Sequence, residues 1–87
     1  MGDEIRREVR SFILRTFLIG EPEASLADST PLITTGIITS LAMLDLVFHL
    51  ETTFGITIPQ AQLSAHDLDT VDRMVELVTG LGAGRRS

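Results

Sequence analysis

The chain has 87 residues and a formal charge of −5, with seven cationic side chains that are all arginine and no cysteine. A chain of this length forms one small domain, and without cysteine it has no disulfide, no thiolate metal site and no cysteine nucleophile. Its acidic balance leaves no basic face for nucleic acid and its two histidines alone make no strong metal site, so we expect protein partners of basic character.

Hydropathy along the chain gives no sign of a leader or a membrane anchor. Residues 1–10 are charged and lack the apolar stretch of a signal peptide. No run approaches the roughly 20 apolar residues that a membrane-spanning helix needs. We therefore expect a cytoplasmic protein that binds no membrane.

The first predicted element is an amphipathic helix between Asp3 and Gly20. Asp3 is a suitable N-cap, and Gly20 is a suitable stop. The apolar positions recur at spacings of three and four residues, which is typical of one buried helix face. They are Ile5, Val9, Phe12, Ile13 and Phe17.

Residues 21–38 have no sustained periodicity and include Pro22, Pro31 and Gly36, so we interpret them as a long ordered loop. Its apolar residues are expected to fold back onto the core. They are Leu26, Leu32, Ile33, Ile37 and Ile38. Long loops inside compact domains are usually functional, and this one leads directly to Ser40.

The second predicted helix runs from about residue 40 to residue 54, with Gly55 as a left-handed C-cap. At about 100° per residue, its apolar side chains separate into two groups. The core-facing group consists of Met43, Leu46, Val47, Leu50 and Phe54. The other group is an outer stripe formed by Leu41, Leu44 and Phe48. Either the long loop covers this outer stripe or it is an exposed docking surface.

The polar wedge of this helix contains Asp45 and His49, which we interpret as a surface pair at i, i+4 spacing. Residues 60–69 predict a single helical turn, and His66 is expected in a solvated loop. A final helix over residues 70–79 is capped by Asp69 or Thr70. Its apolar face is Val71, Met74, Val75 and Val78.

These elements predict an all-α fold, a small bundle of three main helices plus one short helix, with a long first loop. The domain is expected to span residues 1–79. Residues 80–87 are rich in glycine and are expected to form a flexible tail.

Ser40 has three possible roles at the start of the second helix. It could cap the helix, with Thr39 as a capping partner. It could be a nucleophile, but His49 lies nine residues on, about 13 Å along the helix and on the opposite face. It could also carry a phosphodiester, because a helix N-terminus offers free N–H groups and a positive dipole.

The order of these motifs resembles that of acyl carrier and peptidyl carrier proteins. The resemblance covers about residues 4–79. It is carried by "DSTPL" (28–32), "GIITSL" (36–41), "LETTFGI" (50–56) and "DTVDRMVELV" (69–78). It implies an acyl-carrier-like fold in which Ser40 receives 4′-phosphopantetheine from coenzyme A.

The resemblance also implies a non-catalytic, monomeric carrier that holds an acyl or aminoacyl thioester and has no catalytic residue or metal ligand of its own. Its partners would be a phosphopantetheinyl transferase, an adenylating or acyl-loading enzyme, and tailoring and acceptor enzymes. The implied docking residues are Thr39, Leu41, Leu44, Asp45, Phe48 and Glu51. Ile37 and Ile38 resemble discrete carriers of natural-product pathways, of polyketide or nonribosomal peptide type.

Thr39 departs from the family pattern, which usually has aspartate before the serine. That aspartate helps recognition and Mg²⁺ coordination during modification. The alternative hypothesis is therefore an unmodified, carrier-like module that docks partners through the outer stripe.

Overall fold

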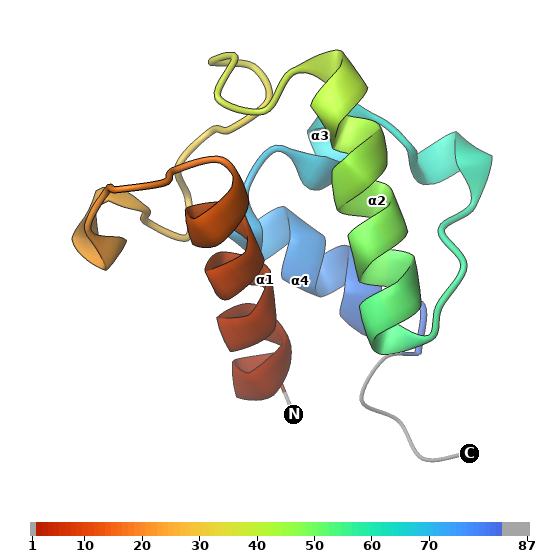
Figure 1. Ribbon diagram of the computed structural model, residues 1–87. Helices are drawn as coiled ribbons and strands as arrows, with labels where there is room; N and C mark the ends of the chain where they lie inside the picture. Colours follow the sequence, from red (N-terminus) through yellow and green to blue (C-terminus); the bar gives the residue numbers. More distant parts are fainter. Residues whose placement is uncertain (1, 83–87) are drawn as a thin grey trace.

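The computed structural model describes residues 2–82 and contains only helices and connecting segments in that range. The elements are α1 (Gly2–Thr16), η1 (Glu23–Ser25), α2 (Ser40–Phe54), η2 (Gln60–Gln62), α3 (Ala65–Leu68) and α4 (Val71–Gly80). In Figure 1, α1 and α2 stand on either side of α4. The predicted all-α bundle of three main helices and one short helix is confirmed. Residues 83–87 of the predicted tail lie outside the described part of the chain.

The core is aliphatic, and its members come from every main helix and from the long loop. The buried residues are Ile5, Val9, Ile13, Leu26, Leu32, Ile38, Leu46, Val47, Leu50, Ile58, Leu68, Val71, Met74, Val75 and Val78. Each fully buried aliphatic side chain contributes about 1.5–3 kcal/mol relative to exposure. The predicted apolar face of the last helix is buried throughout. Of the core-facing group of α2, Met43 and Phe54 are partly buried and pack against this core.

The long loop is held to the core as predicted, with one exception. Leu26, Leu32 and Ile38 are buried, and Ile33 is partly buried. Ile37, predicted as an anchor, is instead 37% exposed. The amide of Ile38 donates to the carbonyl of Leu32 at 2.9 Å, which holds these two side chains inward and leaves Ile37 at the surface.

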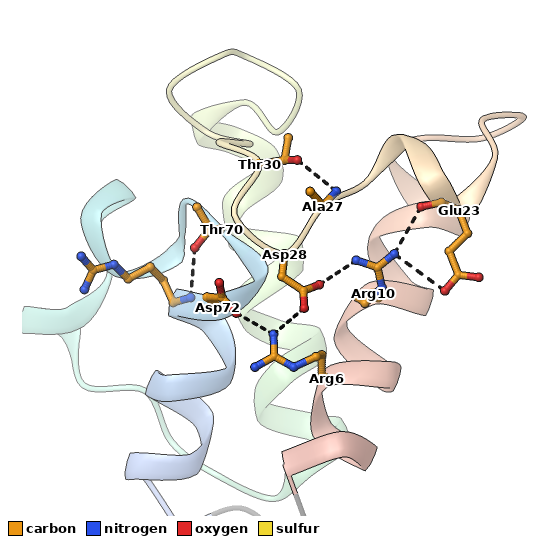
Figure 2. A network of polar contacts seen from close by, with 9 residues as sticks. Arg6, Arg10, Glu23, Ala27, Asp28, Thr30, Thr70 and Asp72 are labelled. Carbon is orange, nitrogen blue, oxygen red and sulfur yellow. Dashed lines mark hydrogen bonds and ion pairs between the residues drawn. The ribbon is translucent and has the colours of Figure 1, made fainter.

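A network of ion pairs joins α1, the loop and α4 (Figure 2). Arg6 Nη1 lies 2.8 Å from Asp28 Oδ2 and 2.6 Å from Asp72 Oδ1. Arg10 Nη1 lies 2.7 Å from Asp28 Oδ1, and its Nη2 donates to the carbonyl of Glu23 at 3.2 Å. Because these groups are partly exposed, their ion pairs contribute only modestly to the stability of the fold. Their main effect is to fix the path of the loop between α1 and α4.

Two predicted helix ends are wrong by a few residues. Helix α1 begins at Gly2, so Asp3 is inside it, and it ends at Thr16. It stops before Gly20 because the amides of Phe17 and Leu18 both bond to the carbonyl of Ile13, at 2.8 and 3.2 Å. The predicted C-cap of α2 is confirmed, since Gly55 is left-handed with φ of 66°.

Candidate functional site

Ser40 is the first residue of α2 and is exposed at the junction with the long loop. Figure 1 shows this junction at the end of α2 that the yellow loop segment enters. Thr39, not Ser40, is the N-cap, because its Oγ1 accepts a hydrogen bond from the amide of Ala42 at 3.1 Å. The capping interpretation of Ser40 is therefore wrong. The hydroxyl of Ser40 makes no hydrogen bond within residues 2–82 and is open to reaction.

The start of α2 suits a negatively charged group on Ser40. The amides of Ser40 and Leu41 bond to no other described residue, and the first turn contains no acidic side chain. Free amides and the helix dipole together stabilise an adjacent anion by about 0.3–1 kcal/mol. The nearest acid along the helix, Asp45, is five residues away, or roughly 7.5 Å of helix rise. A phosphodiester at Ser40 therefore fits this environment.

The outer stripe lies uncovered beside Ser40. Leu41 is 81% exposed, Leu44 is 58% exposed and Phe48 is 67% exposed. Of the two interpretations that the sequence left open, cover by the loop is excluded. Ile37 adds a fourth apolar side chain just before the helix, although its place in an apolar loop segment predicts a core position.

Two acidic side chains flank the outer stripe, and they differ in their surroundings. Asp45 is exposed. Glu51 is half-buried, and its Oε2 accepts a hydrogen bond from the amide of Ile58 at 2.9 Å. Glu51 therefore also fixes the segment that follows α2, and only part of its carboxylate is available to a partner.

The two histidines do not form a catalytic site with Ser40. The predicted surface pair of Asp45 and His49 is wrong. His49 lies between α2 and α1, where its Nε2 is 3.1 Å from Glu8 Oε2. Its side chain is only 18% exposed, because α1 packs against this side of the helix. His66 is exposed, as predicted, but in α3 rather than in a loop. Within residues 2–82, no histidine or carboxylate bonds to the hydroxyl of Ser40.

Asp69 organises the loop that leads to Ser40. Its Oδ1 accepts hydrogen bonds from the amides of Leu32, Ile33 and Thr34 at 3.0, 2.7 and 3.0 Å, and its Oδ2 accepts one from Thr34 Oγ1 at 3.0 Å. Partial burial opposes ionisation, but these hydrogen bonds outweigh it and lower the pKa of Asp69 below its usual 3.8. The sequence offers Asp69 and Thr70 as alternative caps of the last helix, and Thr70 fills that role by accepting from the amide of Arg73.

Comparison with known proteins agrees with this geometry. Residues 16–78 match the family described as "Phosphopantetheine attachment site". A search of the curated proteins gave no match. Because the family match covers most of the chain, the protein belongs to the phosphopantetheine attachment family and is a carrier domain that bears covalent 4′-phosphopantetheine. Such domains are in general non-catalytic and interact with enzymes such as transferases and acyl-loading enzymes.

The described part of the chain was also searched for metal-binding clusters and for membrane-spanning helices. Residues 2–82 contain no group of three or more histidine, cysteine or acidic side chains placed to hold a metal ion. None of the helices in this range combines the length and the apolar composition needed to cross a bilayer.

Proposed function

We propose that Ser40 is the residue that receives 4′-phosphopantetheine, and that the protein carries acyl or aminoacyl groups among enzymes. The observation that carries this proposal is the exposed, unbonded hydroxyl of Ser40 at a helix start whose first amides are free. When attached, the group supplies a terminal thiol that holds its cargo as a thioester. A chain without cysteine can take part in thioester chemistry only through such an added thiol.

The attachment step requires little of this chain beyond presentation of the hydroxyl. The Oγ of Ser40 attacks the phosphorus of coenzyme A that bears the pantetheine group. A new O–P bond forms, the bond to the second phosphate breaks, and 3′,5′-ADP leaves with that electron pair. The hydroxyl proton passes to a base of the transferase, which also holds Mg²⁺. Thr39 offers no carboxylate for these roles, and its Oγ1 already accepts the capping bond from Ala42.

The outer stripe is the docking surface in this proposal. Its three apolar side chains lie on the same side of α2 as Ser40, since positions i and i+4 of a helix share a face and Leu44 follows Ser40 by four residues. Leu41, Leu44 and Phe48 would enter an apolar pocket of each partner. Asp45 and the free part of Glu51 would meet basic groups at the rim, with Thr39 near the reacting hydroxyl.

The partners would be a phosphopantetheinyl transferase, an adenylating or acyl-loading enzyme, and tailoring and acceptor enzymes. The pair Ile37–Ile38 supports a discrete carrier of a specialised-metabolite pathway of polyketide or nonribosomal peptide type, acting in the cytoplasm as a monomer. The exposure of Ile37 supports the docking role, because it extends the apolar docking surface beyond α2.

Thiol titration tests this function directly. The purified chain contains no cysteine, so any thiol that it gains is an added one. After incubation with coenzyme A, Mg²⁺ and a broad-range transferase, followed by removal of small molecules, we expect one titratable thiol per chain. Ser40→Ala should give none.

The same assay separates the two hypotheses. A folded wild-type chain that gains no thiol with several transferases would contradict the carrier proposal and favour the unmodified docking module. Thr39, where the family usually has aspartate, is the feature that supports this second function.

A further inference from the structure

The carboxylate of Asp69 binds three consecutive backbone amides of the long loop. Its Oδ1 lies 3.0, 2.7 and 3.0 Å from the amide nitrogens of Leu32, Ile33 and Thr34. The backbone carbonyl of Asp69 accepts a further bond from Leu32 at 2.7 Å. One residue at the junction of α3 and α4 therefore fixes a segment that is distant in the sequence.

This fixed segment is connected to Ser40 by a short series of contacts. The carbonyl of Leu32 accepts a hydrogen bond from the amide of Ile38 at 2.9 Å, and the side chains of both residues are fully buried. The next residue, Thr39, caps α2, and Ser40 follows it. The position of Leu32, which Asp69 holds, therefore determines where Ile38 lies and where α2 begins.

Asp69 is not needed to start its own helix. Thr70 already caps α4, with its Oγ1 accepting from the amide of Arg73 at 3.0 Å. Each side-chain hydrogen bond of Asp69 goes to the loop instead. These bonds, against the opposing effect of burial, lower the pKa of its carboxyl, which shows that the loop amides favour its ionised form.

We propose that Asp69 is a positioning residue for the modification of Ser40, because it holds the loop in the one arrangement that presents the hydroxyl to the transferase. This inference rests on the proposed function. Without the carboxylate, the amides of Ile33 and Thr34 lose their acceptor. Leu32 keeps only its bond to the backbone carbonyl of Asp69, so the loop occupies several arrangements. Only a fraction of molecules is then ready to dock, so the apparent affinity falls to that fraction of its intrinsic value.

The kinetic signature differs from that of lost stability. Docking on the transferase reforms the productive arrangement, so the KM for the carrier rises while kcat stays close to the wild-type value. We expect Asp69→Ala to raise this KM roughly fivefold to tenfold, as for a competent fraction of about a tenth to a fifth. Asp69→Asn, whose amide oxygen accepts from the same three amides, should restore KM to within about twofold.

Asp67→Ala is the matched control. It removes the same charge two residues away, where the side chain contacts Ser64 rather than the loop. All variants are assayed at a temperature at which circular dichroism shows them folded. Amide hydrogen exchange of the unmodified chains gives a second measurement, and Asp69→Ala should speed exchange at Ile33, Thr34 and Ile38.

The outcomes separate this inference from the proposed function. If the wild-type chain is modified and folded Asp69→Ala keeps the wild-type KM, the positioning role is overturned while the function stands. Unchanged exchange at Ile38 would also overturn it, because the effect would not reach Ser40. If the wild-type chain is not modified by any transferase, the proposed function itself is overturned.

Discussion

The imidazole ring of His49 in α2 lies flat against the ring of Phe12 in α1, with centroids 3.8 Å apart and an interplanar angle of 9°. Phe12 in turn meets Phe17 edge to face, at 5.9 Å and 84°. The edge of the His49 ring makes a polar contact with the same helix, since Oε2 of Glu8 lies 3.1 Å from its Nε2. His49 therefore joins the helix that begins at Ser40 to α1.

Replacement of His49 should weaken this contact between α1 and α2. His49→Ala removes the stacked ring and the hydrogen bond to Glu8, and we expect the free energy of unfolding to fall by about 1–3 kcal/mol. His49→Phe keeps a ring against Phe12 and should lose less. Urea denaturation of both variants measures the difference. Equal stability of His49→Ala and wild type would show that the stacking contributes nothing.

Phe48→Glu tests the docking role of the outer stripe. Because Phe48 is 67% exposed, the change should leave helix content intact and alter the free energy of unfolding by less than about 1 kcal/mol. The KM for the transferase should rise about tenfold or more, as for a lost apolar anchor. Thr79→Glu places the same charge at an exposed position of α4, away from the outer stripe, and is the control. Loss of the fold in Phe48→Glu would mean that this ring belongs to the core.

Thr39 combines capping with a place beside the reacting hydroxyl. Thr39→Ala removes the acceptor for the amide of Ala42 and should cost about 0.5–2 kcal/mol of stability. Thr39→Asp keeps a capping oxygen and restores the residue usual in the family, so kcat/KM for modification should rise without a loss of stability. Thermal unfolding and transferase kinetics measure the two effects. A fall in kcat/KM for Thr39→Asp would contradict this account of the departure.

The low pKa of Asp69 predicts a specific loss of stability in acid. Because its pKa is lower in the folded protein than its usual 3.8, its contribution is complete well above that value and is lost as the pH falls through the folded-state pKa. Other carboxyl groups titrate in the same range, so the comparison with Asp69→Asn isolates the effect. Urea denaturation between about pH 2.5 and 6 should show a steeper loss for wild type. Parallel pH profiles would contradict the assigned hydrogen bonds.

The helices were predictable because their apolar positions follow the helical period and their ends carry turn residues. Val71 and Met74 lie in the core as their spacing predicts, and Gly55 adopts the left-handed conformation that ends α2. The same reasoning separated the outer stripe from the core-facing group, because α2 has more apolar surface than one side can bury, but it left open whether the long loop covers the stripe.

Interactions between distant segments could not be read from local patterns. Asp69 and Thr70 are equally good caps in the sequence, and only the folded loop shows that the carboxylate binds Leu32 to Thr34. His49 looked solvent-exposed on the wheel of its own helix, because that wheel does not include α1. In the same way, nothing local decided which of two adjacent isoleucines, 37 or 38, would enter the core.

The central claim is that Ser40 carries the phosphopantetheine group, and intact-mass measurement with fragmentation tests it most directly. After incubation with coenzyme A, Mg²⁺ and a transferase, the wild-type chain should gain the mass of one phosphopantetheine group, located by fragmentation at residue 40. Ser29→Ala, which alters another exposed serine, should gain the same mass, and Ser40→Ala should gain none. A gain that persists in Ser40→Ala, or that fragmentation places on a different residue, would contradict the account.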